Sequence, residues 1–454
     1  MNTRMEHHNP SDSGLLSKDV FSDETYEAEL ERVFGQAWLF IGHTSMIPHR
    51  GDYVSTYMGE DPVILTRGSG EQINVLLNKC RHRGNRVCLF DHGNGRSFTC
   101  SYHGWSYTGD GTLKAVPFQD ITYGEDFDKS KWGLVRAPRV EEFHGLIFAT
   151  WSEVGPGLAE YLGEAAWYLE QMMLDGAIGG LEVLPGLQRY RMPANWKLLA
   201  ENFAGDQTHV TVTHASVLAV RAAEIDPRLG VLPGRDVRAA GTSFAVACNH
   251  GHGAPHGLLE IRVGDSYYEH DLAQAELLGP EAVEWVRKRH ETRSRQMAEQ
   301  GVDPVPYGFH VGNIFPNFSI VGLGTAFDGV GLIMWMPRGP NETEVWQWCA
   351  VNRDAPASVR RRQCEVLMEQ QSAAGVFAPD DHENFERLQQ NLRSTEGKHW
   401  PFNYGSRLDQ PRIEQGPNWP GTVIDGLSEE NQREFYRYWG ELMDSPVREA
   451  VTPT

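Results

Sequence analysis

Two short Cys/His pairs decide the interpretation of this chain: Cys80-Arg81-His82-Arg83-Gly84 and Cys100-Ser101-Tyr102-His103-Gly104-Trp105. One residue separates the Cys and His of the first pair, two separate those of the second, and seventeen lie between the pairs. Thiolate sulfur and imidazole nitrogen are ligands of zinc and of iron, so two such pairs can form loops that meet at a metal. Spacing alone leaves a structural Cys₂His₂ zinc site open.

The sequence around these pairs predicts a small all-β domain. Strand-like runs at 63–66, 73–78 and 146–151 are separated by Gly, Asp and Asn turn clusters. The pattern extends over residues 51–151. Both Cys/His pairs therefore fall in one β domain.

The rest of the chain mixes helical and strand-like patterns. Helical spacing predicts helices over 22–40, 158–174, 357–371, 381–392 and 428–443, and from residue 196 onward. Strands are predicted at 187–192, 330–336 and 344–351. Residues 218–264 are rich in Gly, Pro and His and predict long loops. The mixture indicates a larger α+β domain.

A second group of metal-binding side chains lies in the larger domain. Asp206 and His209 share one face of a regular helix, whereas His209 and His214 lie five residues apart. The helix must end or bulge between the two histidines if both imidazoles are to reach one ion. Downstream, Asp380 and Asp381 offer a carboxylate at a helix N-terminal turn, where a plain helix cap is the alternative use. An Fe(II) ion bound by two histidines and one carboxylate keeps coordination positions open for O₂ and substrate.

The Cys/His pairs and their neighbours closely resemble the Rieske [2Fe–2S] motif of the large subunits of naphthalene- and biphenyl-type ring-hydroxylating dioxygenases. The likeness runs from residues 38–43 (Trp-Leu-Phe-Ile-Gly-His) to the Asp380-Asp381 segment and is weak over 218–307. In such centres two cysteines hold one iron and two histidines the other. The resemblance assigns the cluster to Cys80, His82, Cys100 and His103.

The same resemblance implies a mononuclear Fe(II) held by His209, His214 and Asp381, with Asp380 as the near alternative. It further implies that Asp206 hydrogen-bonds His209 and the His103 of a neighbouring subunit. A simple helix-face charge is the alternative for Asp206. Candidate substrate-binding residues near the iron are Asn202, Phe203, Gln207, Val210, His310, Asn313, Phe315 and Phe377.

The fold implied by the resemblance is α+β, with a small all-β Rieske domain inserted into a larger catalytic domain built on an antiparallel sheet. The expected division is residues 1–40 as the N-terminal helical part of the catalytic domain, 41–155 as the Rieske domain and 156–454 as the catalytic iron domain. The implied assembly is a trimer of alpha subunits, with or without a small beta subunit (alpha3 or alpha3beta3).

The implied function is that of a terminal oxygenase component that adds O₂ to an aromatic ring by cis-dihydroxylation. The expected substrate is a polycyclic or substituted aromatic, and an aromatic acid or an oxygen-bearing ring stays open because Gln207 and His310 add polarity near the iron. The resemblance implies that electrons come from NADH through a reductase and a ferredoxin. The chain has no dinucleotide-binding fingerprint, so the NADH chemistry is expected on another protein. A monooxygenase outcome uses the same ligands and stays open.

Composition narrows the other function classes. A net charge of −20 over 454 residues argues against nucleic-acid binding, which needs clustered Lys and Arg. The sequence has neither a run of about 18 apolar residues nor a signal-peptide core, so we expect a cytoplasmic protein without a membrane span. Six scattered cysteines do not make a disulfide framework. A simple electron-carrier protein would explain neither the length of the chain nor the second group of metal ligands. A zinc-binding interaction module would be colourless, because Zn²⁺ is d¹⁰, whereas a [2Fe–2S] protein is red-brown.

Overall fold

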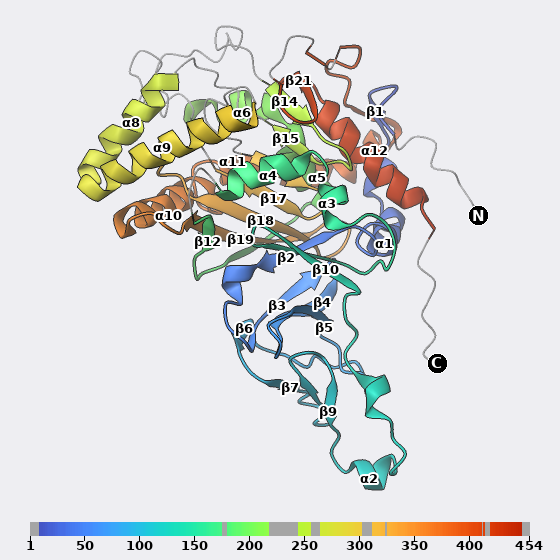
Figure 1. The fold of residues 1–454 in the computed structure, drawn as a ribbon. Helices are drawn as coiled ribbons and strands as arrows, with labels where there is room; N and C mark the ends of the chain where they lie inside the picture. Colours follow the sequence, from blue (N-terminus) through green and yellow to red (C-terminus); the bar gives the residue numbers. More distant parts are fainter. Residues whose placement is uncertain are drawn as a thin grey trace. The chain divides into compact units, whose positions relative to one another are not determined.

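The computed structural model describes residues 9–174, 179–217, 244–255, 264–301, 311–322, 325–410, 412–413 and 418–446. They divide into two units that are nested in the sequence: residues 9–29 and 159–446 form one unit, and residues 30–158 form the other. Figure 1 colours the chain by residue number. Both units are built on antiparallel strands, and helices are concentrated in the larger one, as the α+β prediction requires.

The unit of residues 30–158 is mainly β. Its three antiparallel sheets have the strand orders β10-β11-β2, β5-β4-β3-β6 and β7-β8-β9. The strands are β2 (Leu39–His43), β3 (Asp52–Met58), β4 (Asp61–Arg67), β5 (Ile73–Leu77), β6 (His92–Asn94), β7 (Ser97–Thr99), β8 (Ser106–Thr108), β9 (Leu113–Ala115), β10 (Arg139–Phe143) and β11 (Leu146–Thr150). Side chains of β4, β5, β7, β8 and β9 form an apolar core that also includes Cys80, Cys100 and Trp105. The small all-β domain predicted from the turn pattern is confirmed.

The larger unit is centred on an antiparallel sheet. Its described residues form nine strands in the order β12-β19-β18-β17-β16-β15-β14-β21, with β13 also paired to β19. Strands β18 (Val330–Pro337) and β19 (Thr343–Asn352) are buried along almost their whole length, which means that both of their faces are covered. The remaining strands are β12 (Leu181–Val183), β13 (Gln188–Met192), β14 (Phe244–Ala247), β15 (Gly253–Pro255), β16 (Val311–Ile314), β17 (Phe318–Val321) and β21 (Thr422–Asp425).

Helices pack around this sheet. Helix α5 (Trp196–Gly205) contacts strands β15 to β18 and also helix α12 (Glu430–Asp444), while α10 (Ala357–Gln371) contacts β18 and β19. The other helices are α1 (Asp23–Arg32), which crosses the boundary between the units, α3 (Leu158–Leu162), α4 (Ala165–Leu174), α6 (Gln207–Thr213), α8 (Gly264–Leu278), α9 (Pro280–Gln300) and α11 (Ala378–Leu392). A two-stranded sheet pairs β1 (Leu15–Leu16) with β20 (Phe402–Asn403).

Three expectations from the sequence are wrong in detail. The helix predicted over 22–40 ends at Arg32 as α1, and residues 39–40 belong to strand β2. Within the segment predicted as loops, residues 244–247 and 253–255 are strands β14 and β15, because cross-strand pairing with β21 and β16 completes their backbone hydrogen bonds. The helix predicted from residue 196 onward is two helices, α5 and α6, which meet at Asp206. The remainder of the predicted loop segment, residues 218–243 and 256–263, lies outside the described residues.

No helix in the described ranges combines the length and the apolar composition that crossing a bilayer requires.

Candidate metal centres

The break between α5 and α6 is organised by Asp206. Its backbone N–H donates to the Asn202 carbonyl (3.1 Å) and so closes the last turn of α5. Its side chain then caps α6, because Oδ1 accepts the backbone N–H of His209 (3.2 Å). One residue thus ends one helix and begins the next, and its carboxylate is held in a fixed direction.

His209 is oriented by the same turn. Its Nδ1 lies 2.6 Å from the Asp206 carbonyl oxygen, which can only accept, so Nδ1 carries the hydrogen. Nε2 is therefore the nitrogen with a free lone pair. Burial lowers the pKa of His209, but the hydrogen bond and charge of Asp206 and the charge of Asp381 outweigh it and leave the pKa raised. Burial likewise opposes ionisation of Asp206, and the hydrogen bonds from His209 reverse the effect and lower its pKa.

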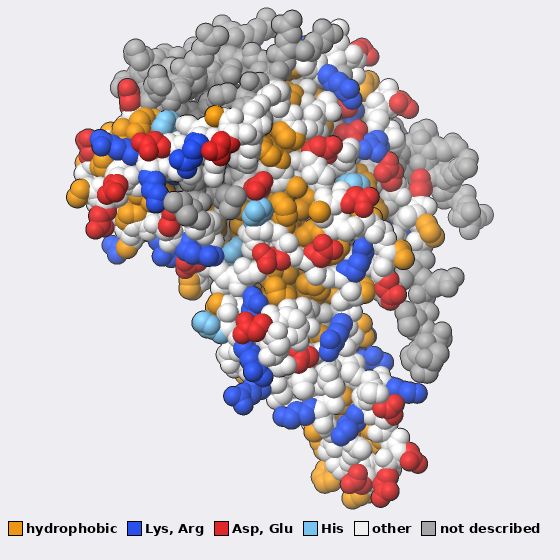
Figure 2. Space-filling view, viewed as in Figure 1, with side chains coloured by type: hydrophobic (Ala, Val, Ile, Leu, Met, Phe, Trp, Pro, Cys, Tyr) orange, Lys and Arg blue, Asp and Glu red, His pale blue; other side chains and the backbone are white. Residues whose placement is uncertain are grey.

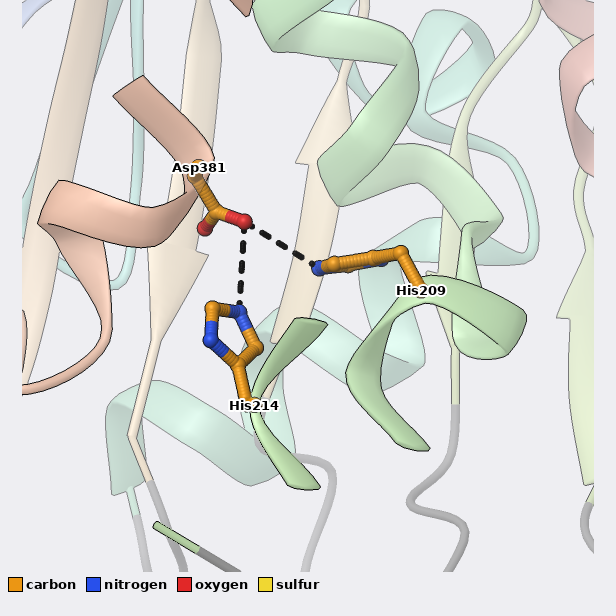
Figure 3. A group of neighbouring side chains, drawn as sticks. All are labelled: His209, His214 and Asp381. Atoms are coloured by element: carbon orange, nitrogen blue, oxygen red, sulfur yellow. Dashed lines mark ion pairs between the residues drawn. The ribbon is translucent and has the colours of Figure 1, made fainter. Parts of the chain in front are cut away.

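His214 and Asp381 complete a cluster with His209. Helix α6 ends at Thr213, so His214 leaves the helix and turns its ring toward that of His209, with ring centroids 5.3 Å apart. Oδ1 of Asp381, in the first turn of α11, lies 3.5 Å from Nε2 of His209 and 3.2 Å from Nε2 of His214. The ligand atoms all lie within 4.8 Å of one another. Figure 3 shows the three side chains pointing at a common centre.

Asp380 takes a different position from Asp381. Its Oδ2 lies 3.5 Å from Nδ1 of His214, and its side chain is 47% exposed, against 17% for Asp381. Only Asp381 approaches both imidazoles through one oxygen. Bonds of about 2 Å to one ion put neighbouring ligand atoms roughly 3 Å apart, which the separations around Asp381 match.

The predicted substrate-binding residues fall into four groups. Close to the cluster, Nδ2 of Asn202 lies 3.3 Å from Nδ1 of His209, and the buried ring of Phe377 lies 5.1 Å from that of His214. Phe203 packs on Trp335, Val210 is half-buried on α6, and Asn313 is buried with its Oδ1 2.9 Å from Ser319 Oγ. Phe315 instead belongs to the core, where its ring contacts those of Trp196, Phe435 and Tyr438. His310 and the side chain of Gln207 lie outside what the structure describes.

The two Cys/His pairs form matching loops in the unit of residues 30–158. Gly84 and Gly104 adopt positive φ (78° and 73°), and their N–H groups donate to the carbonyls of Cys80 (2.8 Å) and Cys100 (3.0 Å). A Cβ at Gly104 would lie 2.8 Å from Pro117, which explains the need for glycine there. Each loop folds back on its cysteine and presents the histidine beside it.

The histidines of the two loops meet. The ring centroids of His82 and His103 lie 4.5 Å apart, and the ring of His82 stacks on the buried Trp105 (5.2 Å, 8°). The buried Nδ1 of His82 has no hydrogen-bond partner among the described residues. A buried nitrogen without a partner is costly unless it binds something else, so this atom fits a metal ligand.

Two polar neighbours of the cysteines were not predicted from the sequence. The Tyr107 hydroxyl lies 3.3 Å from Cys80 Sγ, and Asn85 Nδ2 lies 3.6 Å from Cys100 Sγ. Burial raises the pKa of Cys80, whereas at Cys100 backbone hydrogen bonds and Asn85 outweigh burial and lower the pKa. The nearness of both residues to the motif in sequence was the available signal, but it does not tell which way a side chain points.

Comparison with known families gives two matches. Residues 158–445 match the ring hydroxylating alpha subunit (catalytic domain), and residues 37–124 match the Rieske [2Fe–2S] domain. The first match contains His209, His214 and Asp381, and the second contains both Cys/His pairs.

Individual relatives cover nearly the whole chain. The alpha subunit of biphenyl 2,3-dioxygenase from Rhodococcus jostii (strain RHA1) is 38% identical over 97% of this chain and 92% of its own length. A benzene 1,2-dioxygenase alpha subunit of Pseudomonas putida is 36% identical over 97% of this chain and 94% of its own length. The crystal structure of naphthalene 1,2-dioxygenase from Rhodococcus sp. bound to indole superposes with a TM-score of 0.79 at 30% identity, covering 97% of each chain.

Proposed function

The chain belongs to the ring-hydroxylating dioxygenase alpha subunits, and from this premise we propose that His209, His214 and Asp381 hold its catalytic iron. It is the terminal oxygenase component of an aromatic-ring dioxygenase, and its cofactors are a Rieske [2Fe–2S] cluster and a mononuclear iron. It works with O₂, an aromatic substrate and electron-transfer partners. When bound, the mononuclear iron supplies the activation of O₂.

The observation that carries the proposal is the convergence of two imidazole nitrogens on one carboxylate oxygen, at 3.5 and 3.2 Å. Two histidines and a carboxylate suit Fe(II) and leave positions open for O₂ and substrate. The hydrogen bond from His209 Nδ1 to a backbone carbonyl fixes the tautomer that frees Nε2. Asp380 is left as a neighbour of His214 outside the ligand set.

We propose Cys80, His82, Cys100 and His103 as the ligands of the cluster. The paired loops bring the two imidazoles together, and the partnerless Nδ1 of His82 supports its use as a ligand. Trp105 covers His82 on one face and keeps water from it. The proposed Rieske domain spans residues 41–155, between an N-terminal helical part (1–40) and a catalytic domain (156–454).

Asp206 is proposed to join the two kinds of centre between neighbouring subunits of a trimer. Its side chain is 37% exposed although it caps α6 and contacts His209. It therefore has a surface on which to receive a hydrogen bond from the His103 of a neighbouring subunit. That contact would orient both rings and shorten the electron path.

The surface of residues 30–158 supports assembly with other copies. Exposed apolar side chains lie beside His103 (Tyr102), on α2 (Gln119–Thr122) and its two flanks (Ile121, Phe118 and Tyr123), and at the end of the 3-10 helix Lys129–Trp132 (Trp132). Figure 2 shows hydrophobic and basic side chains on this unit. Lys and Arg nearly balance Asp and Glu in residues 30–158, so almost all of the net charge of −20 lies in the rest of the chain. A near-neutral unit with exposed Arg83 and Arg86 suits contact with an acidic neighbour.

The assembly, the electron donors and the substrate class are proposed on the same basis. We propose an alpha3 or alpha3beta3 particle in the cytoplasm, reduced by NADH through a reductase and a ferredoxin. The substrate is proposed to be a polycyclic or substituted aromatic that undergoes cis-dihydroxylation. Phe377 offers a flat apolar contact beside His214, and the amide of Asn202 lies beside His209, where it can hydrogen-bond a polar group of the substrate.

Asp206→Asn tests the bridging role, because it keeps the shape of the side chain but removes its charge. The variant should retain both metals and an unchanged Rieske EPR signal, while turnover falls at least a hundredfold. In a single-turnover experiment the reduced cluster should reoxidise slowly with O₂ and aromatic substrate present. Asp354→Asn, on an exposed turn, serves as the matched control. Wild-type reoxidation, or loss of the mononuclear iron, would overturn the bridging role.

A further inference from the structure

The end of helix α5 leaves a backbone carbonyl without its helical partner. In a continuous helix the Ala204 carbonyl would accept the N–H of residue 208, but the chain breaks at Asp206. Nδ2 of Asn431 donates to this carbonyl instead, at 2.7 Å. Asn431 is the second residue of α12, lies 227 positions further along the chain and is 1% exposed.

The neighbouring residues make room for this contact. A Cβ added at Gly205 would lie 2.3 Å from the Cβ of Asn431, and one added at Gly253 would lie 2.0 Å from the Ala204 carbonyl oxygen. Both approaches are closer than real Cβ atoms allow. Gly205 thus allows α12 to pack closely against the last turn of α5, and Gly253 allows β15 to do so from the other side. The turn therefore cannot shift toward either element.

Helix α12 is also linked to the beginning of α5, through hydrogen bonds and a buried ion pair. Trp439 of α12 donates its indole N–H to Glu29 (2.8 Å), and Glu29 forms a buried ion pair with Lys197 in the first turn of α5. Arg433 of α12 also donates to the Tyr404 carbonyl (2.7 Å), and the Tyr404 hydroxyl binds Glu201 on α5 (2.9 Å). Helix α12 therefore holds α5 along its length, and Asn431 is its contact at the break.

We propose that Asn431 is a positioning residue, which fixes Asp206 and His209 by holding the Ala204 carbonyl at the break between α5 and α6. Asp206 follows this carbonyl by two residues, and its carboxylate sets the first turn of α6 and so the ring of His209. A shift of the last turn of α5 therefore moves both side chains. The inference rests on the proposed roles of Asp206 and His209.

Asn431→Asp is the sharpest test, since it preserves shape but replaces the N–H donor with an oxygen. At pH 8 we expect kcat to fall about tenfold or more, since small misplacements of reacting groups cost one to two orders of magnitude. Cluster content and the Rieske EPR signal should stay at wild-type levels. The EPR spectrum of the reduced protein with nitric oxide, a probe of the mononuclear iron, should broaden or shift.

The activity of Asn431→Asp should depend on pH in a way that a general loss of stability would not reproduce. The introduced carboxyl regains a donor when it is protonated, and its position against a carbonyl raises its pKa. The ratio of variant to wild-type kcat should therefore rise as the pH is lowered from 8 to 6. Asn431→Ala lacks any donor and should show a low, pH-independent ratio.

Met443→Ala, at the opposite end of α12, is the control for general weakening of this helix. It should lower thermal stability and leave the nitric oxide spectrum unchanged. If both Asn431 variants keep the wild-type spectrum and lose no more activity than Met443→Ala, the positioning role is wrong while the ligand assignment stands. If Asp381→Ala keeps its mononuclear iron, the ligand assignment fails independently of Asn431.

Discussion

Replacing Lys197 with methionine would leave the carboxylate of Glu29 buried without a cation. Both side chains are fully buried, and Glu29 also accepts the indole N–H groups of Trp196 (2.8 Å) and Trp439 (2.8 Å). The Lys197 ammonium lies 5.1 to 5.8 Å from the ring centres of Phe21, Trp196 and Trp439. Removing one partner of a buried ion pair costs about 3–5 kcal/mol. We expect Lys197→Met to lower the melting temperature of the catalytic unit by about 10 °C.

Glu29→Gln and the double variant measure the interaction free energy between Glu29 and Lys197. Glu29→Gln should cost less than Lys197→Met, because the lysine keeps its aromatic neighbours and can lose its proton; burial already lowers its pKa. The double variant Glu29→Gln/Lys197→Met buries no charge, and the amide oxygen still accepts from the tryptophans. It should recover at least 2 kcal/mol relative to the sum of the two single changes.

Scanning calorimetry of the assembled enzyme measures these differences, and tryptophan fluorescence reports on Trp196 and Trp439 in the same samples. Single changes whose costs add within about 0.5 kcal/mol in the double variant would show that Glu29 and Lys197 do not interact. A Lys197→Met protein that melts within about 2 °C of the wild type would contradict the expected cost of the unpaired buried charge.

Two other changes probe charge and hydrogen bonding at separate places. Burial raises the pKa of Glu201 to about 8, so the folded protein keeps a proton that the unfolded chain releases near pH 4.5, and its stability should fall as the pH rises between these values. Glu201→Gln should make the melting temperature depend less on pH over this range. Equal pH dependence of the melting temperature in the variant and the wild type would contradict this prediction. The Tyr107 oxygen accepts from the Arg81 N–H (3.1 Å), which leaves its own hydrogen for Cys80 Sγ. Tyr107→Phe should therefore lower the cluster potential by about 40 mV, equivalent to one net hydrogen bond of about 1 kcal/mol, and an unchanged redox titration would argue against this contact.

Features that depend on residues close together in the sequence could be predicted from it. Each Cys/His pair lies within a few residues, and its glycines and tryptophan are adjacent, so the cluster, the family and the α+β fold were predicted and are confirmed. Helix α10 has the predicted bounds, and β18 and β19 differ from prediction by one residue at their ends. These elements have strong local periodicity that tertiary contacts do not override.

The rest depends on contacts between distant parts of the chain. Residues 196–213 have a continuous helical pattern, and the two contacts described at their division, the capping of α6 by Asp206 and the contact of Asn431 with Ala204, cannot be predicted from it. Strands β14 and β15 are short and become strands through their partners in the sheet. The choice between Asp380 and Asp381 likewise depends on where the first turn of α11 faces, which adjacent identical residues do not reveal.

Iron content per chain in Asp381→Ala, measured together with the Rieske EPR signal, shows whether Asp381 binds the mononuclear iron. Wild-type protein purified without air should contain about three irons, two in the cluster and one mononuclear. Asp381→Ala should contain about two irons, with an unchanged Rieske signal and no turnover, whereas the control Asp380→Ala should keep about three. An Asp381→Ala protein that retains its third iron, or an Asp380→Ala protein that loses it, would contradict the assigned site.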